Sequence, residues 1–424
     1  MRIASRLKGS HFVRSVAVLA TGTALAQAIP VLASPILTRL YTPADFGVLA
    51  VFMAIVSSIS PAVCGKYEVA LVLPKHEAQG KQLFGIAILF AIVVSCIFTV
   101  FLFVTHKWVV NLLDVDQLAG WLYLTPLALF LTGLFQASSY FANRLKCYKL
   151  MAQSKLVQAI TVVFVSVFLG LAGVGFAGLL LGNVIALLLA TGFIFYAHRA
   201  RLTSKVFSSW KKKRILMARY KDYPIFNGSS SLLDGITLSL PIFFLAHYFP
   251  ESIVGYFALL LRVANAPLSF ISVSVSQVNL RKVVDLVNER RDVTPYIYKL
   301  ALLLIAIVSV PTVVLVLFAP ELFAFIFGES WREAGVYSQI LIPALAVRFV
   351  ASTLSSTLGA TRNNQYGALW KVIALFSTLV VFAWFAPKGD IIIFLYAALV
   401  NDVLLYILYF IFIVKAAKMP RNLV

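Results

Sequence analysis

Twelve apolar runs, each about 20 residues long, divide the chain and decide what it can fold into. They lie near residues 14–36, 46–65, 83–104, 120–141, 154–173, 177–197, 225–248, 253–275, 299–318, 336–357, 370–386 and 391–414. A helix needs ~20 mostly apolar residues to cross the ~30 Å hydrocarbon core of a bilayer. The sequence therefore predicts an all-α polytopic membrane protein with about twelve transmembrane helices.

The overall composition agrees with this prediction. Hydrophobic residues make up 61% of the 424 residues and charged residues 12%, whereas soluble domains have roughly 45–50% and about 25%. A water-soluble fold is excluded. The runs also fill the chain, so a separate soluble domain has no room.

The basic residues sort by loop and thereby predict the orientation of the helices. Thirty of the 36 lysines and arginines lie at the two ends of the chain or in even-numbered loops. The odd-numbered loops hold only Arg39, Lys107, Arg332 and Lys388. Cytoplasmic loops are the ones enriched in Lys and Arg, so both termini and all even-numbered loops are expected in the cytoplasm. The net charge of +20 is then explained by topology, and nucleic acid is not an expected partner.

The longest inward loop divides the spans six and six. It contains a basic run, residues 210–214, followed by Ile215, Leu216 and Met217, and such an amphipathic stretch suits a leaflet of anionic phospholipids. We therefore expect an N-terminal lobe at 1–198, a linker at 199–223 and a C-terminal lobe at 224–424.

An internal repeat supports this division. The motif YTPADFG (residues 41–47) opens the second span, and YFPESIVG (residues 248–255) opens the eighth. Further matches are Pro61 with Pro267, and residues 142–144 with residues 360–362. Together they predict two parallel six-helix repeats related by an axis along the membrane normal, an architecture found in transporters.

Four ionisable residues lie about ten residues from a span end, close to the predicted midplane: Asp234, Arg262, Arg348 and Asp402. A charge at that depth costs ~2.5–3.5 kcal/mol on insertion scales, so it normally faces a wet cavity or an opposite charge. One interpretation is two Asp–Arg pairs that only hold helices together. The other assigns Arg262 and Arg348 to an anionic substrate, because a guanidinium binds phosphate through two hydrogen bonds, and assigns Asp234 and Asp402 to H⁺ or Na⁺.

The N-terminal half offers uncharged polar groups at similar depth. Gln27 and Gln136 could hydrogen-bond sugar hydroxyls in a cavity, or could serve helix packing. The chain lacks a phosphate-binding glycine loop, a plausible Ser-His-Asp arrangement and a His/Cys cluster with metal spacing. No catalytic residue, metal or cofactor is therefore expected, and the pattern favours a transporter over an enzyme.

Charged and aromatic residues at span ends form a second group of candidates. Arg39 and Asp45 flank the first outer loop, and Lys66 and Glu68 the first inner loop, where ion pairs could open and close with a gate. Ordinary anchoring at the membrane interface is the alternative. Trp331 is expected to be an interface anchor, because its amphipathic ring suits the headgroup layer.

Two segments carry a family resemblance. Residues 34–47, SPILTRLYTPADFG, and residues 66–74, KYEVALVLP, resemble the opening signature of bacterial polysaccharide-biosynthesis flippases. These are the O-antigen and exopolysaccharide branch of the multidrug, oligosaccharidyl-lipid and polysaccharide exporter superfamily. The resemblance implies two six-helix lobes in a V that open alternately to each side of the bacterial cytoplasmic membrane.

The resemblance also implies a cargo: an undecaprenyl-diphosphate-linked oligosaccharide moved from the inner to the outer leaflet. A polysaccharide polymerase and a chain-length regulator are the protein partners that it suggests. A lipid II flippase or a multidrug exporter of the same superfamily would share this fold. A membrane polymerase or glycosyltransferase is a further alternative, but the short outer loops argue against it.

Overall fold

Every regular element in the computed structural model is helical, and strands are absent from the residues that it describes, 18–199 and 210–418. Eleven of the described helices are long and apolar enough to cross a membrane. The fourth predicted span falls on a further helix, α6 (Leu124–Arg144), whose second half carries Gln136, Ser138, Tyr140 and Asn143. Those polar residues lower its hydropathy. The predicted all-α fold with about twelve spans is confirmed.

The chain forms two compact units, and two helices pass from one to the other. Unit 1 comprises Met1–Tyr41 and Val48–Ser239, and unit 2 comprises Thr42–Gly47 and Leu240–Val424. The helices α3 (Pro43–Ile59) and α10 (Ser229–Tyr248) each change unit within their length.

Unit 1 begins with a helix from Val18 that turns at Ala33 and ends at Leu40. The part after Ala33 is α2 (Ser34–Leu40). The other helices that lie wholly in unit 1 are η1 (Ser60–Ala62), α4 (Tyr67–Ala70), α5 (Glu77–Leu113), η2 (Asp116–Trp121), α6, α7 (Tyr148–Leu171), α8 (Phe176–His198), α9 (Trp210–Arg219) and η4 (Tyr223–Gly228). Part of the predicted linker, residues 200–209, lies outside the described residues.

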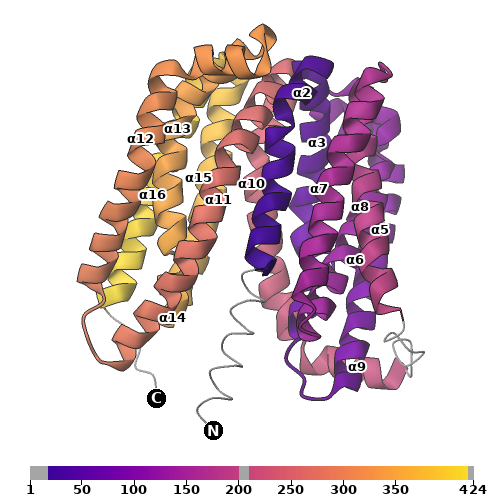
Figure 1. The fold of residues 1–424 in the computed structure, drawn as a ribbon, viewed down its shortest axis with the longest axis vertical. Helices are drawn as coiled ribbons and strands as arrows, with labels where there is room; N and C mark the ends of the chain where they lie inside the picture. Colours follow the sequence, from indigo (N-terminus) through magenta and orange to yellow (C-terminus); the bar gives the residue numbers. More distant parts are fainter. Residues whose placement is uncertain (1–17, 200–209, 419–424) are drawn as a thin grey trace. The chain divides into compact units, whose positions relative to one another are not determined.

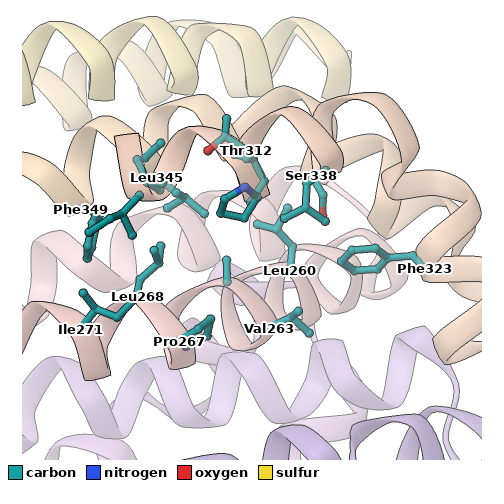
Figure 2. Close-up of a pocket in the computed structure, with 17 residues that line it drawn as sticks. Leu260, Val263, Pro267, Leu268, Ile271, Thr312, Phe323, Ser338, Leu345 and Phe349 are labelled. Atoms are coloured by element: carbon teal, nitrogen blue, oxygen red, sulfur yellow. The ribbon is translucent and has the colours of Figure 1, made fainter. Parts of the chain in front are cut away.

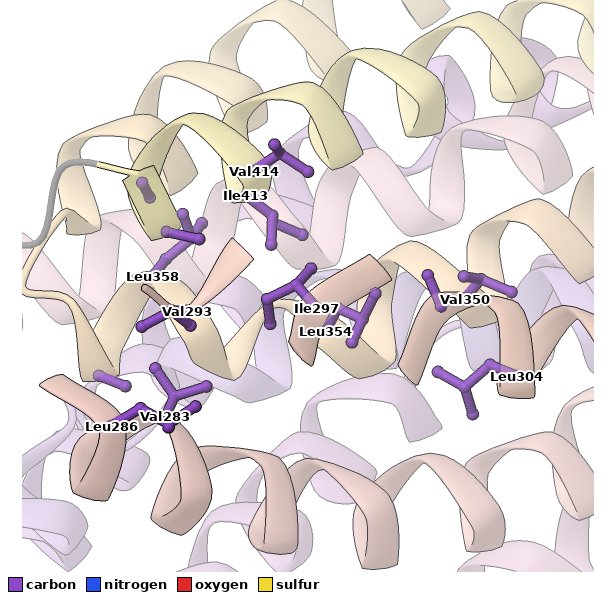
Figure 3. Packing of buried hydrophobic residues seen from close by; sticks show 14 of the residues in the cluster. Val283, Leu286, Val293, Ile297, Leu304, Val350, Leu354, Leu358, Ile413 and Val414 are labelled. Carbon is purple, nitrogen blue, oxygen red and sulfur yellow. The ribbon is translucent and has the colours of Figure 1, made fainter. Parts of the chain in front are cut away.

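Unit 2 contains α11 (Glu251–Asn288), α12 (Thr294–Phe327), η5 (Glu329–Trp331), α13 (Arg332–Leu354), α14 (Ser356–Ala360), α15 (Asn364–Phe385), η6 (Ala386–Lys388) and α16 (Ile391–Lys418). Figure 1 shows α12, α13 and α16 side by side, and all three are in contact. Figure 3 shows the core where they meet α11 and α14, built from Val283, Ile297, Leu354, Leu358 and Ile413.

The core of unit 1 gathers around the short helix α4. Cys64 and Tyr67 pack with Leu83 of α5, Phe141 of α6 and Leu216 of α9 in one cluster of buried side chains. The Tyr67 hydroxyl also donates a hydrogen bond to the Met217 carbonyl oxygen, at 3.3 Å. One face of the basic helix α9 is therefore anchored to the protein, while Trp210 and Ile215 stay exposed.

The two repeats diverge after their matching prolines. In the first repeat α3 ends before Pro61, and the chain turns through Gly65 and Lys66, both with left-handed backbone (φ +59° and +58°). In the second repeat α11 runs through Pro267 as one helix. Glycine enters the left-handed region without the strain that a side chain causes, and the residues after Pro267 offer no glycine.

The third predicted match in the repeat is out of register. Lys146 and Arg362 both have left-handed backbone (φ +58° and +56°) just after α6 and α14. The residue after each donates its backbone N–H to a carbonyl five residues earlier, Cys147 to Ala142 and Asn363 to Leu358. This is the helix-ending Schellman pattern. Lys146, rather than Arg144, is therefore the counterpart of Arg362.

The outer motifs of the two repeats meet at a close helix crossing inside unit 2. A Cβ atom added at Gly47 would lie 1.9 Å from the Glu251 carbonyl oxygen, and one added at Gly255 would lie 1.8 Å from that of Pro43. Each glycine thus faces the carbonyl four residues before the other glycine. Small residues permit such close approach of helices, and the reciprocity supports pairing Gly47 with Gly255 in the repeat.

Trp331 lies against this crossing and is fully buried. Its ring meets Phe46 edge-on at 5.0 Å and Tyr256 at 6.0 Å between centroids. These are the residues next to Gly47 and Gly255. The prediction that Trp331 is an interface anchor is wrong, because the ring fills the space beside two helices that glycine brings together.

Candidate functional site

The structure brings two of the four predicted midplane charges together. Arg348 of α13 and Asp402 of α16 are both half-buried, and the positive charge of Arg348 acts on Asp402. The Arg348 guanidinium carbon lies 5.8 Å from the ring centroid of Tyr406, within the range of a cation–π contact. Tyr406 follows Asp402 by one helical turn, so all three groups share one region of unit 2.

The other two charges lie in different units. Arg262 is half-buried in α11 of unit 2, and Asp234 is half-buried in the part of α10 that belongs to unit 1. The residue after Asp234 is Gly235, where an added Cβ would lie 2.5 Å from the Ser58 carbonyl oxygen. Asp234 therefore sits where α10 crosses α3 closely. The roles of all four residues stay predictions.

An apolar cavity of about 250 Å³ lies within unit 2, between α11, α12 and α13. Figure 2 shows Leu260, Pro267 and Leu268 of α11 facing it, with Leu345 and Phe349 of α13 on another side. It is larger than the ~150 Å³ apolar cavities that stay dry and bind benzene. Such a cavity suits a hydrocarbon chain.

Prolines from two helices contribute to the lining of the cavity. Pro267 of α11 and Pro311 of α12 both lie inside their helices and both line the cavity. Proline cannot donate a backbone hydrogen bond to the preceding turn of its helix. The only hydroxyl groups in the lining belong to Thr312 and Ser338, and that of Ser338 donates to the Ala334 carbonyl oxygen at 2.8 Å.

The two glutamines lie in unit 1 and differ in exposure. Gln136 of α6 is half-buried, and its Nε2 donates to the Ser60 carbonyl oxygen at 3.4 Å. This contact ties α6 to the segment after α3, in line with the helix-packing alternative. Gln27, in the first helix, is exposed.

The motif at residues 41–47 forms hydrogen bonds that stabilise the local structure. The Tyr41 hydroxyl donates to the Ser166 carbonyl oxygen at 2.6 Å. Asp45 accepts from both the backbone N–H and the hydroxyl of Thr42, at 2.8 and 2.7 Å, and its own N–H donates back to that hydroxyl. This reciprocal arrangement is a capping box at the start of α3. The Asp45 carboxylate is thus occupied by the helix end, and Arg39 is exposed.

Lys66 and Glu68, which are predicted to form an inner gate, differ in exposure. Lys66 Nζ lies 4.0 Å from Glu68 Oε1, and the side chains are 20% and 2% exposed. Glu68 is therefore inside the protein rather than an anchor at the interface. Nearby, the Arg144 guanidinium donates to the carbonyl oxygens of Leu71 and Pro74 at 2.8 and 2.7 Å, which fixes the segment that follows α4.

Sequence reasoning missed two polar groups. Lys155 lies in the second turn of α7, half-buried, where its Nζ donates to the Thr23 hydroxyl at 3.2 Å. The N-terminal half therefore carries a half-buried charge in addition to the uncharged polar groups expected there. Tyr406 was also missed, although its i, i+4 spacing from Asp402 could have indicated it. In the described residues no group of three His, Cys, Asp or Glu side chains could hold a metal.

A family model described as "Polysaccharide biosynthesis protein" matches residues 36–336. The match covers most of the chain, including nearly all of the two motif segments, Arg262 and the cavity residues of α11 and α12, and it ends before the cavity residues of α13. No curated protein sequence matches the chain.

Solved structures with the same fold are transporters. The lipid II flippase MurJ, in an inward closed conformation, has a TM-score of 0.73 at 14% identity, covering 93% of this chain and 86% of that one. An inward-facing multidrug resistance MATE family transporter of the MOP superfamily has a TM-score of 0.66 at 14% identity, covering 95% and 99%. A MOP superfamily transporter from Pyrococcus furiosus has 0.64 at 12% identity, covering 95% and 96%. At these identities the likeness concerns the fold.

Proposed function

We propose that this chain, which belongs to the polysaccharide biosynthesis protein family, moves an undecaprenyl-diphosphate-linked oligosaccharide from the inner to the outer leaflet of the bacterial cytoplasmic membrane. The fold is that of flippases and exporters, and the chain is a multi-pass membrane protein rather than an enzyme. Movement would occur by alternating access, coupled to H⁺ or Na⁺ through Asp234 or Asp402. Both termini would face the cytoplasm.

One observation carries the choice of cargo: α11 and α13 line the apolar cavity and also carry Arg262 and Arg348. A lipid-linked oligosaccharide has an isoprenoid chain next to a diphosphate. The cavity offers an apolar surface for part of that chain, and a guanidinium binds phosphate oxygens with two parallel hydrogen bonds. The two helices therefore present both kinds of surface that such an amphiphile needs.

The proposed partners are anionic phospholipids and two proteins of polysaccharide assembly. The exposed Trp210 and Ile215 and the basic residues of α9 suit anionic phospholipids at the cytoplasmic surface. A polymerase and a chain-length regulator would consume the cargo after it crosses. Lipid II is the second candidate cargo, because MurJ has the same fold and lipid II is also a diphosphate-linked lipid.

The test is complementation of a strain that lacks surface polysaccharide because this gene is deleted. Arg262→Ala and Arg348→Ala are each expected to abolish most export at normal protein levels. Arg332→Ala is the matched control, since Arg332 is exposed and already bound to Glu329 at 2.6 Å. Normal export by both Arg262 and Arg348 variants would contradict the proposal. Lipid analysis of the deletion strain distinguishes the cargoes, because the lipid-linked species that accumulates identifies what is carried.

A further inference from the structure

Glu68 is a carboxylate folded into the interior of unit 1. The left-handed turn at Gly65 and Lys66 reverses the chain after α3, and α4 then packs against α5, α6 and η4. This places the Glu68 side chain at 2% exposure, beside the buried cluster that contains Cys64 and Tyr67. Buried carboxylates are rare unless they are paired.

Three donors of this region are engaged with main-chain carbonyls. Glu68 Oε2 has no hydrogen-bond partner. The Cys64 thiol donates to the Gly133 carbonyl oxygen at 3.2 Å, the Tyr67 hydroxyl to that of Met217, and the Arg144 guanidinium to those of Leu71 and Pro74. Three groups that could stabilise an ionised carboxylate therefore donate their hydrogen bonds to main-chain carbonyls instead.

The charged groups on the elements around α4 do not supply the missing hydrogen bonds to Glu68. On α5, Glu77 and Lys81 pair with each other at 3.1 Å. The titratable groups at this end of α6 are Tyr140 and Arg144, that of η4 is Tyr223, and α9 carries the buried Lys213. The cation whose charge acts on Glu68 is Lys66, and its Nζ lies at 4.0 Å, beyond hydrogen-bonding distance.

An ionised carboxylate in this position is costly. Removing a charge from water without full hydrogen bonding costs several kcal/mol, and groups in such sites usually neutralise instead. Burial accordingly raises the pKa of the Glu68 carboxyl, while its own backbone N–H and Lys66 oppose that rise. Protonation removes the charge and turns one oxygen into a donor.

We infer that Glu68 is a proton-binding site, neutral while α4 is packed in unit 1 and able to release its proton when α4 moves away from α5 and α6. The segment lies at the predicted cytoplasmic end of the N-terminal lobe. Its use in coupling rests on the proposed function, whereas proton binding itself does not. The site is separate from Asp234 and Asp402, to which sequence reasoning assigned the coupling ion.

The experiment is labelling of the full-length purified protein with a hydrophobic carbodiimide, which modifies protonated carboxyls in apolar surroundings. Trypsin then releases residues 67–75, in which Glu68 is the only acidic residue, and residues 76–81, in which Glu77 is the only one. Glu77 is 62% exposed and ion-paired, so it is the internal control. Labelling of Glu68 is expected to exceed that of Glu77 and to fall about tenfold per pH unit above its midpoint.

A second measurement does not depend on reagent entry. The folded protein keeps the Glu68 proton above the ordinary carboxyl pKa of 4.5, whereas the unfolded chain has lost it. Stability from this group is therefore present at low pH and is lost as pH rises toward the raised pKa. The apparent melting temperature should decline over this range in the wild type and decline less in Glu68→Gln.

Three results would overturn the inference. The first is labelling of Glu68 no greater than that of Glu77, together with identical pH dependence of melting in the wild type and Glu68→Gln. The second is labelling that does not change with pH. The third is protection by Na⁺ at constant pH, which would make the site a sodium site. None of them depends on transport, so they are distinguishable from failure of the proposed function.

Discussion

The Gly47–Gly255 crossing allows a prediction whose size follows from the coordinates. Gly255→Ala would put a Cβ atom 1.8 Å from the Pro43 carbonyl oxygen, and real Cβ atoms stay at least 3.0 Å from such atoms. The start of α3 must therefore withdraw by about 1.2 Å. Inserting one carbon into a packed site costs typically 1–3 kcal/mol, and a gap of 0.5–1 Å already forfeits a quarter to a half of the contact energy around it.

The assay is thermal unfolding of the purified protein, followed through tryptophan fluorescence, because Trp331 is buried beside the crossing. Gly255→Ala should lower the apparent melting temperature, by an amount that corresponds to about 1–3 kcal/mol. Gly192→Ala is the control: Gly192 lies inside α8 with nothing within 4 Å of its added Cβ. That change should stabilise the protein by up to about 1 kcal/mol, because alanine is the better helix former.

The reciprocal geometry sharpens the test. Gly47→Ala should cost about as much as Gly255→Ala, since its added Cβ meets the Glu251 carbonyl at 1.9 Å. One withdrawal of α3 relieves both contacts, so the double variant should cost less than the sum of the two single variants. Melting of Gly255→Ala indistinguishable from that of Gly192→Ala, or strict additivity in the double variant, would refute the reasoning.

Two further predictions concern a loop and a charge. Arg144→Leu should release the segment that contains Leu71 and Pro74, at a cost of about 2–4 kcal/mol from lost charge-assisted hydrogen bonds, and should speed proteolytic cleavage after Lys75. Cleavage no faster than in Lys149→Leu would show that this clamp is unimportant. Asp402→Asn should remove the dependence of transport on an ion gradient in reconstituted vesicles while substrate binding persists. Full gradient dependence in this variant would exclude Asp402 from coupling.

The helices could be predicted from sequence because each needs a run of apolar residues, and such runs are visible without any knowledge of tertiary structure. The residues at which these helices begin and end could not be predicted in the same way. The third span was expected at 83–104, yet α5 covers Glu77–Leu113, because polar residues continue a helix beyond the hydrocarbon region. The start of α3 at Pro43 depends on the capping box between Thr42 and Asp45.

The candidate site was predictable only in part. Charge inside an apolar run singles out Arg348 and Asp402, but their proximity depends on the packing of α13 against α16. The cavity depends on how three helices pack together, and the sequence pattern of a single helix does not show that. Glu68 is the clearest example of a residue whose position could not be predicted. A charged residue in a loop is expected to face water, whereas Glu68 is buried because of the left-handed turn at Gly65 and Lys66, shortly before it in the chain.

Three helices are much longer than a bilayer requires. The lengths of α5, α11 and α12 are 37, 38 and 34 residues, or roughly 50–57 Å at 1.5 Å per residue, against a hydrocarbon core of ~30 Å. Each therefore exceeds the hydrocarbon core by roughly 20–27 Å, counted over both of its ends, so these three place little constraint on how deep the protein sits. Shorter spans such as α3, with 17 residues before its break, must set that depth. Lipids of different chain length should consequently disturb the α3 segment first, while the long helices adapt by tilting.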